Sequence, residues 1–303
     1  MADNLVLTPP AKINLYLKVL GRREDGYHLL ATLMQKIDLC DTITLSRTET
    51  PGIHLQCPDS SLPENKENIV YRAAELFFKE QGNILSKTQG VTIVLQKKIP
   101  VAAGLGGGSS DAAAVLRGLN RLFHTGCGPD QLAEMGLRLG ADVPLFVHDW
   151  PVAWATGIGE QLSPARGLDD GWLLLVNPDF PVSTKWVYEN LALTAKEKKI
   201  NLKNSHCNVE QGEAVSSPDR PFLSDDLHND LEQVTIQKYQ EIDRIKKQLL
   251  QAGAQGALMS GSGPTVFAIF REQDLDLARQ CQGLFLKTYK QVYLVRPLAN
   301  GNS

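Results

Sequence analysis

The sequence predicts a globular chain that mixes α-helices with β-strands and divides into two domains. The chain has 303 residues, and a domain usually holds about 100–200 residues. Segments with strand periodicity and segments with helix periodicity both occur in the first half, and the pattern changes past residue 150. Hydrophobic residues make up 43% of the chain, which suits a folded core. We place the domain boundary near residue 155.

Hydrophobic periodicity predicts the individual elements. Every second residue is apolar along 11–20, which indicates a strand. Apolar residues recur at helical spacing along 109–123, and the N-cap candidates of this helix are Ser109, Ser110 and Asp111. We also expect helices over 71–78, from Pro129 onward and over 236–252, strands over 91–95, 172–176, 264–270 and 291–295, and two strand ends around a turn within 153–162. Residues 201–221 are polar and aperiodic, which predicts an exposed insertion.

Composition argues against several classes of protein. The 31 basic and 34 acidic residues give a net charge of −3, and the pI is about 6.1. Neither value suits a nucleic-acid binder or a polybasic membrane-surface protein. No apolar run approaches the ~18 residues of a membrane span. The N-terminus lacks a signal-peptide pattern, and the five cysteines form no CxxC pair. We therefore expect a cytoplasmic protein with reduced thiols.

A glycine-rich segment follows a predicted strand and opens into the helix over 109–123. It consists of Pro100, Val101, Ala102, Ala103, Gly104, Leu105, Gly106, Gly107, Gly108, Ser109 and Ser110. Glycines allow an anion to approach the backbone, and a helix N-terminus adds a partial positive charge. This order predicts a phosphate-binding loop, although it matches neither the Walker A nor the Rossmann pattern. The alternative is a tight turn of small residues.

Three further segments carry polar residues in apolar surroundings. Lys12 and Asn14 share one face of the strand over 11–20, and the alternative is a solvated face. Asp142 lies in a turn bounded by glycine and proline, and the alternative is a helix cap. The segment 259–265 is rich in glycine and serine, and the alternative is a hairpin turn.

In this order, the segments 10–15, 100–110 and 259–265 resemble the three motifs of the GHMP family of small-molecule kinases. The resembling stretches include PAKINLYL, PVAAGLGGGSSDAA, LGADVPLFV, GIGE and HNDLE, and they span most of the chain from Ala11 to Phe270. The segments DGYH (25–28) and GADVP (140–144) resemble one branch of the family rather than its mevalonate or homoserine kinases.

The resemblance implies an α+β GHMP kinase fold. It implies an ATP-binding domain of the ribosomal-protein-S5 type over 1–155, a ferredoxin-like domain over 156–303, and an active site in the cleft between them. It also implies transfer of the ATP γ-phosphoryl group to the tertiary 2-hydroxyl of a methylerythritol linked to cytidine diphosphate, in non-mevalonate isoprenoid synthesis. The partner is then a small molecule, and we expect a monomer or weak homodimer.

The resemblance also assigns roles to residues. Asp142 is the expected base and Lys12 the cation that orients it, since a tertiary hydroxyl needs a proton acceptor. The loop over 100–110 and Lys97 are expected to hold the triphosphate, and Asn68 is expected to contact adenine. Mg²⁺ is expected from phosphoryl chemistry, with Ser110 as the nearest hydroxyl. For Lys97 the alternative is an exposed strand-end lysine, and for Asp111 the alternatives are a metal ligand or a helix start.

The substrate handle has its own expected contacts. Tyr27, His28 and Tyr188 match the family's cytidine-binding positions, and Asn14 matches a polar substrate contact. Phe180 is the alternative to Tyr188 as the stacking ring. Three other functions stay open: a GHMP kinase for another small alcohol, a silent nucleotide sensor, and a phosphate-binding interaction module. Retention of both Lys12 and Asp142 argues against the sensor, because a pure binder needs neither.

Overall fold

The computed structural model describes residues 4–58, 60–82, 90–191, 222 and 224–299, so the predicted insertion over 201–221 lies outside the described residues. The chain forms two compact units. The first comprises residues 1–11, 39–101 and 106–149, and the second comprises residues 12–38, 102–105 and 150–303. The change of unit at residues 149–150 lies near the predicted boundary. Residues 12–38 and 102–105, which precede that boundary, nevertheless belong with the second unit.

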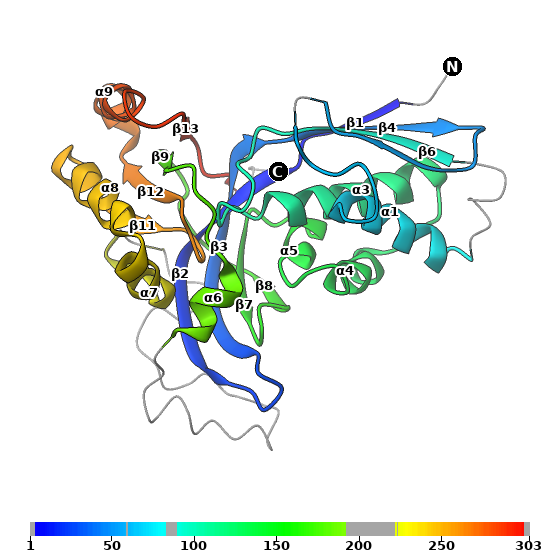
Figure 1. The fold of residues 1–303 in the computed structure, drawn as a ribbon, viewed down its shortest axis with the longest axis horizontal. Coiled ribbons are helices and arrows are strands. Elements are labelled where there is room, and N and C mark those ends of the chain that lie inside the picture. The colour runs from blue at the N-terminus through cyan, green and yellow to red at the C-terminus, as the bar shows by residue number, and fades with distance from the viewer. Residues whose placement is uncertain (1–3, 59, 83–89, 192–221, 223, 300–303) are drawn as a thin grey trace. The chain divides into compact units, whose positions relative to one another are not determined.

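The first unit is a four-stranded sheet covered by helices (Figure 1). Its strand order is β1-β4-β6-β5, with β1 Asn4–Leu7, β4 Thr42–Thr48, β5 Gly52–Gln56 and β6 Gly90–Gln96. Its helices are α1 Ile69–Glu80, α3 Gly107–Phe123, α4 Pro129–Leu137 and α5 Val143–Val147. Alternate residues of β4 and β6, such as Ile43 and Ile93, are fully buried. The period-two pattern therefore places one face of the sheet in the core.

The second unit contains two sheets. One has the order β10-β2-β3-β7-β8, with β2 Pro10–Arg22, β3 His28–Cys40, β7 Val152–Thr156, β8 Gln161–Pro164 and β10 His228–Asn229. The other has the order β11-β12-β9-β13, with β9 Trp172–Asn177, β11 Gly256–Met259, β12 Val266–Phe270 and β13 Gln291–Val295. The helices of this unit are α6 Thr184–Glu189, α7 Asp230–Lys238, α8 Gln240–Gln251 and α9 Leu275–Phe285.

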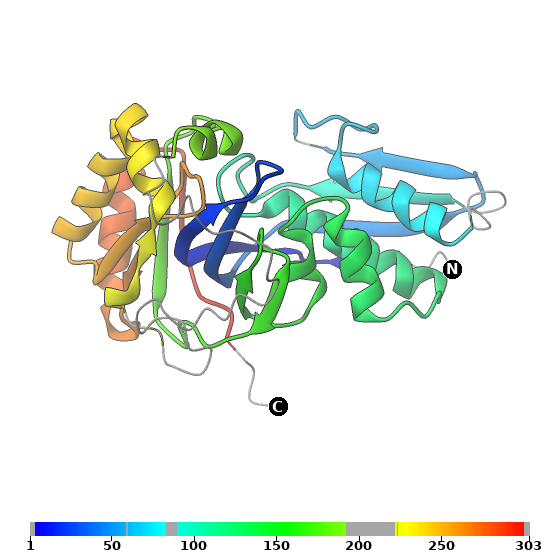
Figure 2. The same ribbon diagram turned by 90° about the horizontal axis from the view of Figure 1, so that it is seen from below.

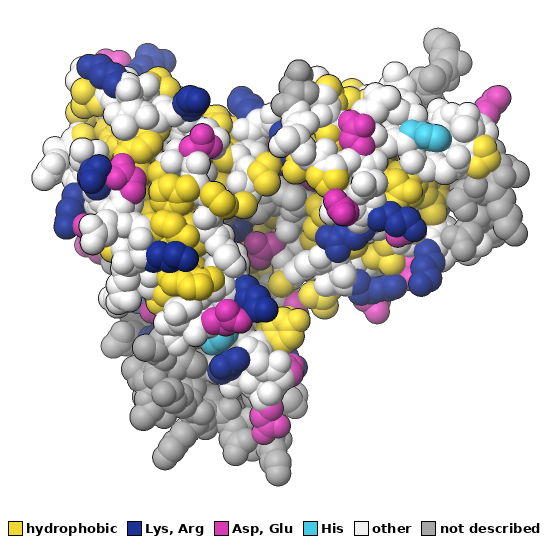
Figure 3. All heavy atoms as spheres, in the orientation of Figure 1, with side chains coloured by type: hydrophobic (Ala, Val, Ile, Leu, Met, Phe, Trp, Pro, Cys, Tyr) yellow, Lys and Arg dark blue, Asp and Glu magenta, His cyan; other side chains and the backbone are white. Residues whose placement is uncertain are grey.

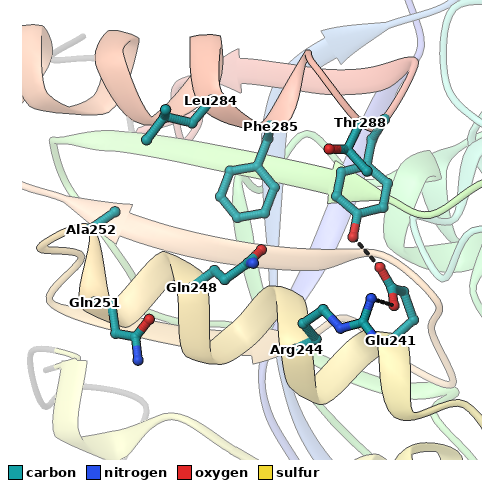
Figure 4. Close-up of a pocket in the computed structure, with 9 residues that line it drawn as sticks. Glu241, Arg244, Gln248, Gln251, Ala252, Leu284, Phe285 and Thr288 are labelled. Carbon is teal, nitrogen blue, oxygen red and sulfur yellow. Dashed lines mark hydrogen bonds and ion pairs between the residues drawn. The ribbon is translucent and has the colours of Figure 1, made fainter.

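Helices α8 and α9 lie side by side on one face of the second sheet (Figure 2). Between them is a pocket of about 550 Å³. Tyr289, which follows α9, donates a hydrogen bond to Glu241 of α8, and Figure 4 shows Glu241 beside Arg244 on that helix. Glu241 also pairs with Arg244 at 2.9 Å. These polar contacts link α8 to the residues that follow α9. Phe285 of α9 adds an apolar contribution to the same core as α8.

The structure corrects two sequence predictions. Helix α3 begins at Gly107 after the N-cap Gly106, so the predicted N-cap residues 109–111 already lie inside the helix. The predicted helix over 236–252 is two helices, α7 and α8, which are separated at Tyr239. The predicted strands over 11–20, 91–95, 172–176, 264–270 and 291–295 are confirmed.

The surface mixes charges of both signs. On the face drawn in Figure 3, Lys and Arg side chains are interspersed with Asp and Glu. Within the described part of the chain, every helix is too short or too polar to span a membrane.

Candidate active site

Three segments far apart in the sequence meet in the second unit. The Ser260 hydroxyl donates to the Gly104 carbonyl at 2.9 Å and accepts from the Asn14 amide at 3.3 Å. The Lys12 amide donates to the Leu105 carbonyl at 2.9 Å. The N-terminal strand, the centre of the glycine-rich loop and the segment 259–265 therefore form one hydrogen-bonded group. The third segment is a hairpin loop between β11 and β12, as one alternative proposed, and it also joins this group.

Glycine is required at Gly104 by this close approach. Its φ is +76°, and a Cβ there would lie 2.2 Å from the Ser260 carbonyl oxygen. Side-chain-bearing residues rarely adopt that φ, and no Cβ tolerates that distance. The loop is also held by the Ala103 carbonyl, which accepts from the Thr265 amide at 3.4 Å. The glycine-rich segment is thus a tight turn of small residues, as the alternative proposed, and the same turn contacts the segments around Lys12 and Ser260.

Lys12 and Asn14 are both buried, with exposed fractions of 4% and 3%, so the solvated strand face is wrong. The Lys12 ammonium donates to Asn14 Oδ1 at 2.6 Å. Asn14 Nδ2 donates to the Thr32 hydroxyl at 2.9 Å, and that hydroxyl donates to the Tyr16 carbonyl at 2.6 Å. This chain fixes the amide orientation of Asn14, and with it an acceptor for the ammonium group.

Asn229 is a residue that the sequence analysis did not assign. Its Nδ2 donates to the Met259 carbonyl at 2.7 Å and the Gly261 carbonyl at 2.8 Å. Its Oδ1 accepts from the Leu231 amide and caps α7. The HNDLE segment that supported the resemblance therefore shapes the loop over 259–265. The signal available in the sequence was an asparagine, a residue favoured at helix N-caps, directly before the segment that forms α7.

In the first unit, the start of α3 has the geometry of an anion site. The N-cap Gly106 has a φ of +70° and makes no side-chain cap, and the first backbone bond is Ser110 N to Gly106 O at 2.9 Å. The helix geometry leaves the amides of Gly107, Gly108 and Ser109 without intrahelical acceptors. These donors and the helix dipole favour an anion. Among the other loop residues, Val101 is 62% exposed.

Lys97 lies between two buried carboxylates. Its ammonium contacts Asp41 and lies 2.7 Å from Asp111 Oδ2, so the exposed strand-end alternative is wrong. Asp41 is fully buried, and its Oδ1 accepts from the amides of Lys98 at 2.5 Å and Ile99 at 2.8 Å. Asp41 was not singled out from the sequence, although an acid between two apolar strands is unusual.

Burial controls the protonation of this cluster. Burial raises the pKa of Asp111 to about 7, with Lys97 opposing the rise and Asp41 adding to it. Burial lowers the pKa of Lys97, but the two carboxylates outweigh it and the net change is upward. A neutral Asp111 leaves one ion pair between Lys97 and Asp41, which is the arrangement that a buried site tolerates best.

The donors suggested for a metal do not converge. Ser110 and Asp111 are adjacent on α3, so their side chains leave the helix about 100° apart. The Asp111 carboxylate is directed at the Lys97 ammonium, 2.7 Å away. Within the described ranges, no group of three or more His, Cys, Asp or Glu side chains could hold a metal ion. The Asp111 carboxyl contacts the Lys97 ammonium, and Asp111 lies inside α3 and not at its start.

Asn68 and Asp142 both precede a helix, but only the Asn68 side chain caps its helix. Asn68 caps α1 through its Oδ1, which accepts from Val70 N at 3.0 Å, while its Nδ2 donates to the Pro63 carbonyl at 2.9 Å. Asp142 precedes α5 but makes no capping hydrogen bond with its side chain, which is half-buried. Asp142 thus occupies the N-cap position of α5, as the helix-cap alternative predicted, but without a side-chain capping bond.

The predicted cytidine contacts include one stacked pair. The rings of His28 and Tyr188 have centroids 5.0 Å apart and planes inclined by 25°. Burial, with Arg22 nearby, lowers the pKa of His28, so this imidazole is neutral at pH 7. Phe180 stacks instead on Tyr239, with centroids 4.9 Å apart. Tyr27 is 60% exposed on the turn between β2 and β3.

Comparison with known proteins assigns the family. The GHMP kinases N terminal domain matches residues 68–149, and the GHMP kinases C terminal domain matches residues 216–282. The chain is 49% identical to the 4-diphosphocytidyl-2-C-methyl-D-erythritol kinase of Syntrophotalea carbinolica, over 88% of this chain and 89% of that protein. The chain belongs to the GHMP kinase family.

Other relatives agree on the branch of the GHMP kinase family. The Geobacter sulfurreducens protein of the same name is 46% identical over 89% of this chain and 91% of its own length. A crystal structure of a 4-(cytidine 5'-diphospho)-2C-methyl-D-erythritol kinase superimposes with a TM-score of 0.76 at 32% identity, covering 98% of this chain and all of that one. The α+β GHMP kinase fold implied by the resemblance is thus confirmed.

Proposed function

We propose that this chain transfers the γ-phosphoryl group of ATP to the 2-hydroxyl of 4-diphosphocytidyl-2-C-methyl-D-erythritol, a step in non-mevalonate isoprenoid synthesis. The observation that carries this is the 49% identity to a kinase of that name over most of the chain. The meeting of the three GHMP motif segments in one hydrogen-bonded group, within the second unit, supports it.

The reaction needs a proton acceptor and charge neutralisation. The substrate hydroxyl loses its proton to Asp142, its oxygen bonds to the γ-phosphorus, and the bond to the bridging oxygen breaks to release ADP. Lys12 steadies negative charge on the attacking oxygen, while Asn14 and Thr32 hold its ammonium in place. Positioning and electrostatics supply most of the rate in such transfers.

The nucleotide is bound by the glycine-rich loop and its neighbours. The unbonded amides at the start of α3 donate hydrogen bonds to phosphate oxygens, and Lys97 adds a positive charge. Asn68 shapes the start of α1 beside the adenine. Mg²⁺ is carried by the phosphates of ATP and by water, because Mg²⁺ uses few protein ligands and Ser110 and Asp111 leave α3 in different directions.

The cytidine handle stacks on the pair formed by His28 and Tyr188. A base inserted between the two rings would need centroids about 7 Å apart, which is twice a contact of about 3.5 Å. The observed 5.0 Å is too short for insertion, so the base stacks on an outer face or spreads the pair. Tyr27, on the neighbouring turn, supplies an exposed ring nearby in the sequence. We place the enzyme in the cytoplasm as a monomer or weak homodimer.

The direct test is turnover of the cytidylated methylerythritol with Mg²⁺ and ATP. ADP release and a mass gain of one phosphoryl group are followed for the wild type and for Asp142→Asn. We expect at least a ~10³-fold loss of kcat in the variant, because proton removal and charge stabilisation are both lost. Asp149→Asn is the matched control, since Asp149 is an exposed acid just beyond α5.

Each alternative function has its own outcome in this assay. ATP binding without turnover of any alcohol would favour the silent sensor. Turnover only of an alcohol without cytidine would keep the kinase and remove the roles of His28 and Tyr188. For the cytidine site itself, Tyr188→Leu should raise KM for the substrate about tenfold and leave KM for ATP unchanged, because stacking contributes about 1–2 kcal/mol.

A further inference from the structure

The first unit contains a pocket in which Ser110 is the only lining residue with a predicted role. It has a volume of about 450 Å³, within the range of small-molecule sites. One face of α3 forms one wall, and residues 7–10, 129–132 and 146–149 form the others. We call it the α3 pocket.

A buried hydroxyl without a partner lies on this wall. Ser110 is 1% exposed, and its Oγ has no hydrogen-bond partner among the described residues. A buried hydroxyl that is left unsatisfied is unfavourable, so such a group usually marks a bound water or ligand. Ser110, Ala114, Arg117 and Arg121 all line the pocket and follow helical spacing, so they share one face of α3.

The other end of this face is cationic. Arg117 donates to the Phe146 carbonyl at 3.4 Å and pairs with Asp149 at 2.6 Å. Arg121 has no ion-pair partner among the described residues. The pocket lining therefore contains two guanidinium groups and one carboxylate, that of Asp149, and has an excess of positive charge.

The region between these two ends is apolar. Ala114 lies between Ser110 and Arg117 on this face of α3, and the apolar side chains of Pro9, Leu132 and Phe146 also line the pocket. Ser110 and Arg117 are seven residues apart, which is about 10 Å along the helix axis. The pocket thus presents a hydroxyl, an apolar passage and guanidinium groups in that order.

We propose that the α3 pocket binds a small organic anion, with a carboxylate or phosphate on Arg117 and Arg121, a short apolar body along Ala114, and a polar atom on Ser110. Arginine is suited to both anions because its planar guanidinium can form paired hydrogen bonds. The occupant would contact α3, the helix whose first turn carries the predicted phosphate-binding amides. Binding in this pocket does not depend on the proposed kinase activity.

The test measures binding of 6-hydroxyhexanoate by ligand-observed NMR, with saturating ADP to occupy the nucleotide site. We expect saturable binding in the millimolar range usual for so small a ligand. Hexanoate lacks the terminal hydroxyl, so it should bind severalfold more weakly, and 1,6-hexanediol lacks the charge and should bind at least tenfold more weakly.

Variants locate the binding. Ala114→Leu fills the apolar passage and Arg121→Gln removes a charge, and each should weaken 6-hydroxyhexanoate at least fivefold. Ser110→Ala should abolish the difference between 6-hydroxyhexanoate and hexanoate. Arg138→Gln is the matched control, because Arg138 is an exposed arginine that pairs with Glu80 away from the pocket. Since Arg121 is on the surface, its variant tests the proposal even if Ala114→Leu does not fold. No saturable binding up to about 20 mM, or binding that Arg121→Gln leaves unchanged, would overturn the proposal.

Discussion

At the scale of single residues, the buried carboxyl of Asp111 makes stability depend on pH. Its folded pKa of about 7 lies above the ordinary value of 3.8. Between those pH values the folded state holds a proton that the unfolded state has lost, so stability falls as pH rises from about 4 to about 7 and is flat above. In Asp111→Asn this fall should disappear.

The measurement is the free energy of unfolding in urea across pH 4–8. Asp111→Asn should gain stability relative to the wild type as pH rises, by on the order of a few kcal/mol between the ends of the range. Asp149→Asn is the control, because Asp149 is an exposed acid outside the buried cluster. A stability difference that stays constant with pH would contradict the burial of an ionisable group here.

Thr32 is a second residue with a predicted effect, although it bears no charge. Thr32→Val keeps the side-chain shape and removes the hydroxyl between Asn14 and the Tyr16 carbonyl. Two buried polar groups lose a partner, so we expect a loss of about 2 kcal/mol in stability. Because Asn14 then turns freely beside the Lys12 ammonium, kcat should fall about tenfold with KM for ATP nearly unchanged.

The matched variant for this prediction is Thr156→Val, since the Thr156 hydroxyl bonds an exposed glutamine side chain, Gln161. Its stability and kcat should stay close to those of the wild type. If both variants lose the same kcat, the orientation of Asn14 by Thr32 is not what matters.

At the scale of elements, the glycine-rich loop depends on its contact with the hairpin loop over 259–265. Gly104→Ala places a methyl group 2.2 Å from the Ser260 carbonyl oxygen, in a backbone conformation with a φ of +76°. The loops must separate, so we expect KM for ATP to rise at least tenfold. Gly126→Ala shares the strain, with a φ of +73°, but its Cβ would meet nothing within 4 Å. It should cost about 1 kcal/mol of stability and leave KM unchanged.

Helices α8 and α9 give a prediction that concerns stability alone. Tyr289→Phe removes the hydroxyl that donates to Glu241 (Figure 4). Burial and this hydrogen bond raise the pKa of Tyr289, so the phenol is protonated at every pH used for assays. The loss should be about 1 kcal/mol in urea unfolding. Tyr71→Phe is the control, because no hydrogen bond of its hydroxyl is seen within the described residues, and an equal loss there would argue against the Glu241 contact.

A helix or strand could be predicted from the sequence where a single local pattern of apolar residues determined it. The strand around Leu15 follows from alternation and the strand around Phe267 from a short run of apolar residues, and both residues are fully buried. The start of α3 was not, because Gly106 ends the loop through a left-handed backbone conformation that leaves no polar cap in the sequence. The break at Tyr239 was also hidden, since apolar residues continue at helical spacing on both sides.

Some residues of the candidate site could also be predicted from the sequence, and others could not. The resemblance selected Lys12, Asn14, Lys97 and His28, which the structure places in specific contacts. It assigned no role to Asp41, whose contacts with Lys97 and the amides of 98 and 99 arise only when β4 and β6 have paired. Contacts between residues more than 50 positions apart leave no periodicity to detect.

At the scale of the whole molecule, the chain order of the strands differs from their order in the second unit. Strands β2 and β3 come from the first 40 residues, yet they lie between β10 and β7 in the sheet. Leu17 and Val19 of β2 also belong to the apolar core that includes α8 and α9. A boundary drawn at one point of the sequence, near 155, therefore cannot separate two independent folding units.

A fragment of residues 150–303 tests this interleaving. It retains all four strands of the sheet β11-β12-β9-β13, whereas β7 loses β3, its partner from Thr32↔Ala155 to Gln35↔Val152. In hydrogen exchange, we expect the amides of β12 to stay protected and those of β7 to exchange freely, because an isolated two-stranded hairpin of β7 and β8 is marginal in water. Co-expression with residues 1–149 should restore protection of β7. Protection of β7 in the fragment alone would mean that β2 and β3 are dispensable to the second unit, and that the simple boundary is sufficient.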